Sequence, residues 1–474
     1  MPAPSHGRHL IYGLIALSSS FLVFTTFRLI SHDQWQPFTS HLEQYPQPQD
    51  PFNLLPGYDL TVQEHPGCAE RFGRKYLDDL RRNATEYCEP DSGSRLTCFH
   101  SQTARDGRID SFCFGGPAML DFSLKKFRLD CSLRKMSANE SAPRLHQLPS
   151  YWYGTGPSAV FSQSIKVNNL GFSPPKDTKN YTILVKREGE GNPWHSLLEI
   201  FSMSLTIDAL KIDSGDGRYK PFLTNEDAKN TQVVILDRRK NGPYFHLWSL
   251  FAERPTIRLA NISHDALLSE NVIVPLAGGS NPLWQGDWEV FPCQRSDLLR
   301  VFSNRVLDHY QVDRSKPREE QIVVTFIDRK SRRLTHQESY LEALSKNMSQ
   351  IKVQSIDFAA IPFKEQLKVA RATDVLVGVH GAGLTHSMFL REGSVVVEIL
   401  PRDFNHKGFL NVANLLGHSH FSVHASNQNP QPSHLRRDKW HREDVFLEES
   451  RFQELMNVAI KTLYGQIPHH HDVN

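Results

Sequence analysis

Residues 372–401 read ATDVLVGVHGAGLTHSMFLREGSVVVEILP, and this stretch decides the fold. The apolar run Asp374–Val379 predicts a buried parallel strand. His380-Gly-Ala-Gly383 follows, then a segment from Leu384 with room for about two helical turns, then a second β-branched run over Ser394–Leu400. Such a strand–loop–helix–strand unit is typical of open α/β sheets, which bind ligands at the carboxyl ends of their strands. Glycines there let a ligand approach the backbone, although an ordinary tight turn would explain a lone Gly-x-Gly equally well.

The same alternation of strands and helices occurs on both sides of a helix expected over Leu298–Tyr310. It predicts an α/β fold of two Rossmann-like domains facing a cleft, the GT-B type of enzyme. The expected parts are a short tail with an anchoring helix (1–31), a flexible stem (32–66), a Cys-containing segment (67–149), and the two Rossmann-like domains (150–297 and 298–474, the second ending in a helix).

The composition favours a globular chain in the secretory pathway. The 54 basic and 52 acidic residues give a net charge of +2, so nothing indicates a nucleic acid partner. Leu10–Phe27 contains no charged residue and predicts a signal anchor in the lipid bilayer, with a cleaved signal peptide as the alternative.

Cysteines and glycosylation sequons agree with a lumenal location. The six cysteines form no Cys-x-x-Cys pair, which argues against zinc and favours disulfides of undetermined connectivity. Five Asn-x-Ser/Thr sequons are candidates for glycosylation: Asn83, Asn139, Asn180, Asn261 and Asn347.

A basic cluster follows the strand expected over Ile322–Ile327. It consists of Arg329, Arg332 and Arg333, which should reach the same sheet edge as the His380–Gly383 loop and bind a pyrophosphate there. A solvated charge run on a loop is the alternative. Glu398 ends the next strand and is a candidate for hydrogen bonding to ribose hydroxyls, or equally a structural cap.

A second cluster lies in the first domain. His195 and Glu199 are four residues apart on an expected helix and so share a face. A histidine beside a carboxylate is a candidate general base, although such pairs are more often structural. There is no Asp-x-Asp tripeptide to hold a metal–diphosphate complex, and no dinucleotide, P-loop, metalloprotease or lipase motif. We therefore expect no metal site, no tightly bound cofactor and no essential divalent metal.

The sequence HGAGLTH and the residues on either side of it resemble the motif of glycosyltransferase family 61. The stretches IVVTFIDRKSRR and GNPWHSLLEIFSM resemble other parts of the same family. The resemblance is strongest to members that transfer O-linked N-acetylglucosamine to EGF domains, and to their fungal relatives. It implies a GT-B fold and inverting transfer from a UDP-sugar donor. It also implies that His380, Gly381, Ala382, Gly383 and Leu384 form the donor loop. Arg329 and Arg333 would face the diphosphate, with His195 and Glu199 opposite as candidate bases.

The expected function is transfer of a sugar, N-acetylglucosamine in the first instance, to Ser or Thr hydroxyls of secretory-pathway proteins. A pentosyltransferase acting on glycan or polysaccharide is the alternative within the family, and an inactive glycoprotein-binding relative is the alternative from another class. The expected location is the Golgi or endoplasmic reticulum membrane, as a single-pass type II protein with a lumenal catalytic region. The final residues, 468–474, contain no Lys-Asp-Glu-Leu-like retention signal. The donor sugar, the acceptor and the base stay open.

Overall fold

A computed structural model describes residues 58, 66–103, 107–169, 178–213, 220–262, 270–315, 317–426 and 443–465. The chain divides into two units, residues 1–50 and 51–474, and the first unit lies outside the described residues. The expected anchor and nearly all of the expected stem therefore lie outside the description. Within the described part, no helix is long and apolar enough to cross a bilayer.

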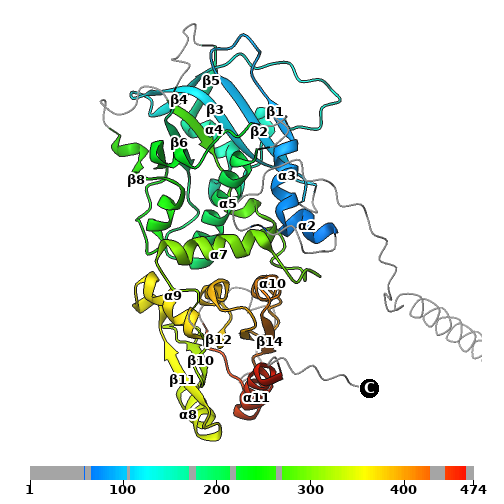
Figure 1. The fold of residues 1–474 in the computed structure, drawn as a ribbon, viewed down its shortest axis with the longest axis vertical. Helices are drawn as coiled ribbons and strands as arrows, with labels where there is room; N and C mark the ends of the chain where they lie inside the picture. The colour runs from blue at the N-terminus through cyan, green and yellow to red at the C-terminus, as the bar shows by residue number, and fades with distance from the viewer. Residues whose placement is uncertain are drawn as a thin grey trace, which may run out of the picture. The chain divides into compact units, whose positions relative to one another are not determined.

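The first sheet has nine strands and is mixed (Figure 1). Its path runs β1-β2-β3-β9-β6-β7-β8, and β4 pairs with β3 and β5. The strands are β1 (Ala84–Glu86), β2 (Arg95–Ser101), β3 (Asp110–Asp121), β4 (Lys126–Asp130), β5 (Ile165–Asn168), β6 (Tyr181–Val185), β7 (Thr231–Ile235), β8 (Arg254–Arg258) and β9 (Glu270–Val274). The pairs β9–β6, β6–β7 and β7–β8 are parallel, as expected of a Rossmann-like unit.

The Cys-bearing strands continue this sheet. β3 pairs antiparallel with β9, so that Cys113 lies opposite Val274. The segment that we expected to stand apart over 67–149 thus shares a sheet with the strands of 150–297. Its apolar strands gain a buried partner in this way, since an isolated meander of a few strands would leave much of their surface in water.

Helix α5 (Pro193–Lys211) lies beneath this sheet and packs against α3 (Arg74–Arg82) and α7 (Asp297–His309). Nearly every residue of α5 from Trp194 to Leu210 is buried, because the helix is apolar on almost all sides and has neighbours around it. The remaining α-helices in the described part of this half are α2 (Pro66–Phe72), α4 (Pro157–Ser164) and α6 (Pro282–Gln285), and short 3₁₀ helices lie between the strands.

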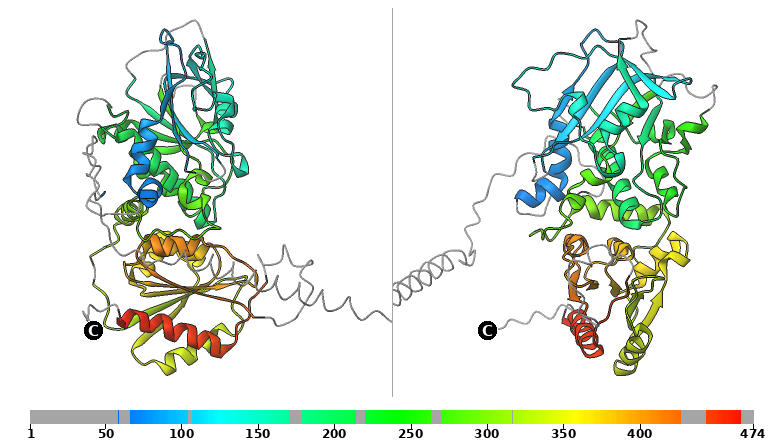
Figure 2. Two further views of the ribbon diagram at one scale, coloured as in Figure 1. Left: turned by 90° about the vertical axis from the view of Figure 1, so that its right-hand side faces the viewer. Right: turned by 180° about the vertical axis from the view of Figure 1, so that it is seen from behind.

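The second sheet is parallel throughout, in the order β11-β10-β12-β13-β14. Its strands are β10 (Ile322–Ile327), β11 (Ile351–Ile356), β12 (Val375–Val379), β13 (Val395–Leu400) and β14 (Ser419–His424). Figure 2 shows helices on both faces: α8 (Gln337–Asn347) and α11 (Glu449–Gly465) on one, α9 (Phe363–Ala372) and α10 (Gly408–Leu415) on the other. Side chains of β12 alternate between these layers, with Val375 and Val377 packed towards α8 and α11 and Leu376 packed towards α9 and α10. The predicted α/β class is confirmed.

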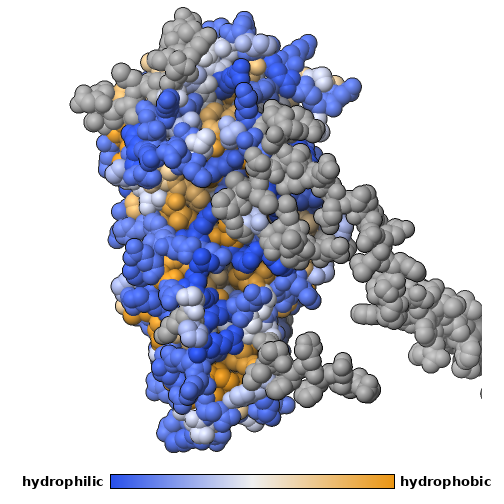
Figure 3. Space-filling view, in the orientation of Figure 1, coloured by the Kyte–Doolittle hydropathy of each residue, from blue (hydrophilic) through white to orange (hydrophobic). Residues whose placement is uncertain are grey.

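Three disulfides join the six cysteines: Cys68–Cys293, Cys88–Cys131 and Cys98–Cys113. The first connects α2 to the segment before α7, across 225 residues of sequence. Hydrophilic residues cover most of the face in Figure 3, with smaller apolar patches between them.

Candidate active site

The loop after β12 has a backbone that only glycine accommodates. His380 continues the sheet by donating its backbone N–H to the Ile399 carbonyl (2.8 Å), and Gly381 then adopts φ +154°. The dihedral requires glycine, and a Cβ on Gly381 would also force the Arg329 guanidinium to move. The helix that follows is a 3₁₀ helix, η8 (Ala382–Phe389), where we expected α-helical turns.

Arg329 and Arg332 both bind this loop. Their Nη1 atoms donate to the His380 carbonyl over 3.0 and 2.7 Å. Burial lowers the pKa of Arg329, and burial together with the charge of Arg329 lowers that of Arg332 to about 10. Two partly buried cations that repel one another are stabilised by an anion, so this edge of the sheet favours one.

Arg333 points elsewhere. Its guanidinium lies 3.7 Å from both Asp328 and Glu338, its side chain is 42% exposed, and its backbone N–H donates to Asp444. The reason is local. Arg332 adopts a left-handed conformation with φ +58°, which turns the backbone so that the side chain of Arg333 points away from that of Arg332. We expected Arg329 and Arg333 to face the diphosphate together, but the two arginines that reach the loop are Arg329 and Arg332.

Glu398 lies beneath the loop and is 1% exposed. Its Oε1 lies 2.5 Å from His380 Nδ1 and its Oε2 lies 3.0 Å from His420 Nε2. Burial by itself raises the pKa of Glu398, but these two hydrogen bonds outweigh it and lower the pKa to about 2. Both oxygens are thus occupied by histidines, which does not fit the expected ribose contact; the carboxylate instead orients His380.

Buried side chains of η8 support the rest of the loop. Leu384 is completely buried, so its side chain belongs to the core and is not exposed to a ligand. Nδ1 of His386 donates to the Gly383 carbonyl over 2.8 Å, and Nε2 lies 2.7 Å from Gln366 Oε1. Burial lowers the pKa of His386 to about 4, so its neutral ring acts as a fixed support for the turn that includes Ala382 and Gly383.

The second cluster centres on a residue that sequence reasoning missed, Glu188. His195 Nδ1 lies 3.0 Å from Glu188 Oε2, and the Glu188 backbone N–H donates to Glu199 Oε1 over 2.6 Å. Asn192 fixes the start of α5 by accepting from the backbone N–H groups of Trp194 and His195. His195 and Glu199 are therefore connected through Glu188, rather than through the expected contact along one helix face.

The two carboxyl groups have different surroundings. Glu199 is fully buried, and burial followed by the nearby charge of Glu188 raises its pKa well above the usual range. Glu199 is thus a poor proton acceptor at neutral pH. The His195 side chain, by contrast, is 24% exposed while its partner Glu188 is fully buried. With Nδ1 donating to the carboxylate, Nε2 of His195 carries the lone pair.

A layer of aromatic rings connects the two clusters. His195 packs edge-on to Trp284 (centroids 4.7 Å apart), and Trp284 lies 6.4 Å from Trp194. Trp194 contacts His406 (6.0 Å), and His406 lies 5.0 Å from His380. Both predicted sites therefore adjoin the same seam between the two sheets.

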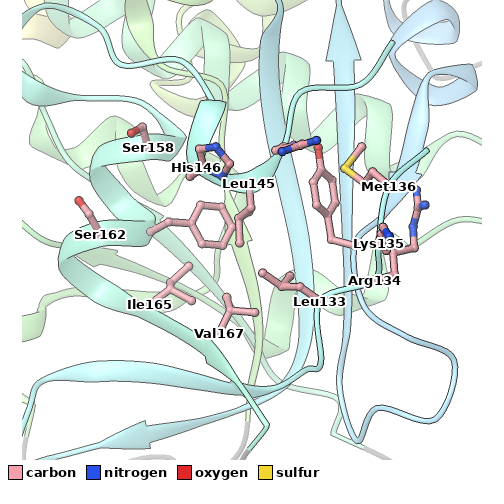
Figure 4. Close-up of a pocket in the computed structure, with 13 residues that line it drawn as sticks. Leu133, Arg134, Lys135, Met136, Leu145, His146, Ser158, Ser162, Ile165 and Val167 are labelled. Atoms are coloured by element: carbon pink, nitrogen blue, oxygen red, sulfur yellow. The ribbon is translucent and has the colours of Figure 1, made fainter. Parts of the chain in front are cut away.

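One pocket of the described chain lies away from these residues (Figure 4). It has a volume of about 720 Å³ and lies between the Leu133–Met136 segment and the residues of α4 and β5, such as Phe161 and Val167. None of the predicted site residues lines it. Among the residues that the structure describes, no group of three or more His, Cys, Asp or Glu side chains is arranged to hold a metal ion.

The five sequon asparagines all fall within the described ranges. Asn83, Asn139, Asn261 and Asn347 are exposed, and Asn180 is half-buried before β6. Their modification stays a prediction.

By its parallel sheet and the basic loop at the strand ends, the second half belongs to the open α/β class. Residues 285–397 match the family model Glycosyltransferase 61. That segment contains Arg329, Arg332 and the His380–Leu384 loop, and the match confirms the resemblance seen in the sequence.

Curated relatives agree with this assignment. The EGF domain-specific O-linked N-acetylglucosamine transferase of Drosophila melanogaster is 27% identical over 228 residues, covering 46% of this chain and 40% of the relative. The protein of that name from Rattus norvegicus is 24% identical over 375 residues, covering 73% and 64%. The matches thus span less than two thirds of these relatives. A solved structure of the heptosyltransferase TibC matches with 13% identity and a TM-score of 0.29, over 65% of this chain and 83% of that chain.

Proposed function

We propose that this chain is an inverting glycosyltransferase with a GT-B arrangement that transfers N-acetylglucosamine from UDP-N-acetylglucosamine to Ser or Thr hydroxyls of secreted proteins. The observation that carries the proposal is the convergence of Arg329 and Arg332 on the His380 carbonyl, inside the segment that matches the family model. The names of the curated relatives support N-acetylglucosamine as the sugar and an EGF-like domain as the acceptor.

The proposed chemistry is a single in-line displacement. Nε2 of His195 accepts the proton of the acceptor hydroxyl as its oxygen attacks the anomeric carbon, and the bond from that carbon to the diphosphate oxygen breaks. Glu188, 3.0 Å from Nδ1, stabilises the imidazolium that forms. The departing UDP takes the negative charge, which Arg329 and Arg332 stabilise at the loop. No step requires a metal ion or a covalent intermediate.

We further propose that the protein works in the lumen of the Golgi or endoplasmic reticulum, held in the bilayer by an N-terminal anchor. Three disulfides support an oxidising compartment. The proposed partners are a UDP-sugar, a glycoprotein or glycan acceptor and the lipid bilayer.

The test uses the purified lumenal chain, UDP-sugars carrying N-acetylglucosamine, xylose, arabinose or glucose, and a folded EGF-like domain as the acceptor. Calorimetry measures UDP binding, and UDP release measures turnover, each with and without EDTA. We expect UDP binding that is weakened about tenfold or more by Arg332→Gln, since hydrogen bonds to charged groups contribute about 1.5–3 kcal/mol, and is little changed by Arg333→Gln. No binding and no release with any donor would exclude the enzyme. Turnover with UDP-xylose alone would replace the proposed sugar.

A further inference from the structure

Two large aromatic side chains stand in solvent beside His195. Trp152 and Tyr153 belong to the 3₁₀ segment η2 (Trp152–Gly154) and are 65% and 59% exposed. The Tyr153 ring contacts His195 edge-on, with centroids 5.7 Å apart. Exposed aromatics of this size at a candidate reaction centre indicate a surface that a ligand covers.

The segment that presents them is constrained. Tyr153 adopts φ +62°, a left-handed conformation that is uncommon for a bulky residue, and Gly154 and Gly156 have φ +63° and +90°. Tyr151 anchors the turn because it is buried and donates its hydroxyl to Asp110. Tyr151 N–H also donates to the Thr155 carbonyl (3.2 Å) and closes the turn. The outward position of Trp152 and Tyr153 is therefore built into the backbone, and strain of this kind gathers at functional sites.

An independent observation comes from the loop that carries Glu188. A Cβ on Gly189 or on Gly191 would meet nothing within 4 Å, and neither residue has a positive φ. Neither packing nor backbone conformation therefore requires glycine at these positions. A ligand that lies against the backbone would require it, because a side chain there would hold the ligand away.

The glycine loop and the aromatic pair adjoin the same residues. Gly278 and Gly279 lie between them. A Cβ on Gly278 would lie 3.2 Å from Glu188 Oε1, and a Cβ on Gly279 would lie 3.8 Å from the Trp152 ring. His195 lies between Tyr153 on its exposed side and Trp284 on its buried side. The surface thus adjoins the His195 ring, whose Nε2 we assign as the proton acceptor.

We propose that Trp152, Tyr153 and the Gly189–Gly191 loop form the acceptor subsite, which takes an extended polypeptide and packs an apolar side chain next to the reacting hydroxyl. The inference rests on the proposed function, which supplies a polypeptide acceptor. An extended chain is the occupant that uses both features: its backbone lies flat on the glycine loop, and its neighbouring side chain packs on the exposed rings.

The experiment measures three quantities for each variant: UDP binding by calorimetry, UDP release without acceptor, and the acceptor KM with a folded EGF-like domain. For Trp152→Ala we expect the acceptor KM to rise about threefold to tenfold, the effect of an aromatic contact, with UDP binding unchanged. Trp152→Phe should recover most of the loss. Tyr464→Ala, which removes an exposed tyrosine from the last turn of α11, is the matched control and should leave the KM unchanged.

The double variant Gly189→Ala, Gly191→Ala separates recognition from folding. It should raise the acceptor KM while its melting temperature stays the same or increases, because added methyl groups in open space reduce the entropy of the unfolded chain. An unchanged KM in this variant and in Trp152→Ala, with a wild type that transfers sugar, would overturn the subsite alone. A wild type that neither binds UDP nor releases it would overturn the proposed function and this inference with it. Preferential transfer to an oligosaccharide would overturn the polypeptide assignment.

Discussion

His380 Nδ1 lies 2.5 Å from Glu398 Oε1, directly beneath the loop that Arg329 and Arg332 bind. Burial lowers the pKa of His380, so its ring is neutral and donates the Nδ1 proton to the charged carboxylate. His420 holds the other oxygen, so the carboxylate cannot turn away. The position of the His380 carbonyl, which both arginines share, thus depends on a buried charge in the neighbouring strand.

Replacing Glu398 with glutamine tests that dependence. The folded-state pKa of Glu398 is lowered to about 2, so its contribution to stability is present above the ordinary pKa of 4.5 and is lost as the pH falls towards 2. We expect Glu398→Gln to lower the free energy of unfolding at pH 7 by about 3 kcal/mol, since each pKa unit corresponds to about 1.4 kcal/mol. Urea unfolding at pH 7 and pH 3 should show the gap between variant and wild type closing at low pH. Glu338→Gln removes an exposed carboxylate as the control, and an equal gap at both pH values would contradict the assignment.

Gly381→Ala tests the packing of the loop. An alanine Cβ would overlap the Arg329 guanidinium, and φ +154° is strained for any residue except glycine. We expect a loss of about 1–3 kcal/mol in unfolding free energy, together with weaker UDP binding. Arg329→Ala in the same chain should restore part of the stability, because it removes the clash but leaves the strained dihedral. If the changes in unfolding free energy caused by the two substitutions simply added, the overlap between the alanine Cβ and the Arg329 guanidinium would have to be relieved in some other way.

The loop and its arginines could be predicted because the information is local. Apolar runs mark β10, β12 and β13, and polar residues that follow parallel strands meet at one sheet edge. The direction of three adjacent cations could not be predicted in this way. One left-handed residue, Arg332, decides which two of them face the loop.

Contacts that no local periodicity specifies account for the other differences. Glu188 follows a strand and has no periodic relation to His195, so only the folded loop brings them together. Glu398 lies inside β13, two residues before the strand ends where we expected it to be the last residue, and the side chains around it come from His380 and from His420 on β14, whose register no local pattern specifies. The antiparallel pairing of β3 with β9 likewise joins segments on either side of a complete α/β unit.

Glu199 makes folding stability depend on pH with the opposite sign to Glu398. Burial raises its folded-state pKa, so the folded chain keeps a proton that the unfolded chain loses above pH 4.5, and stability falls as the pH rises from there. We expect Glu199→Gln, which keeps the shape and removes the charge, to be more stable than the wild type at pH 7.5 and nearly equal to it at pH 4. Thermal unfolding at both pH values measures the difference. A variant less stable than the wild type at pH 7.5 would show that Glu199 is charged in the fold.

Glu188→Gln separates the two candidate bases. The amide keeps the size of the side chain but removes the charge that stabilises protonated His195, 3.0 Å away. We expect kcat to fall about 100-fold or more, within the range of general acid–base catalysis, while UDP binding is unchanged. Glu190→Gln in the same loop removes a carboxylate that lies 3.7 Å from Arg239 and should leave kcat unaltered. If Glu188→Gln kept the wild-type kcat and Glu199→Gln were inactive, then Glu199 would be the base despite its burial, and its carboxyl group would have to lose its proton when substrate binds.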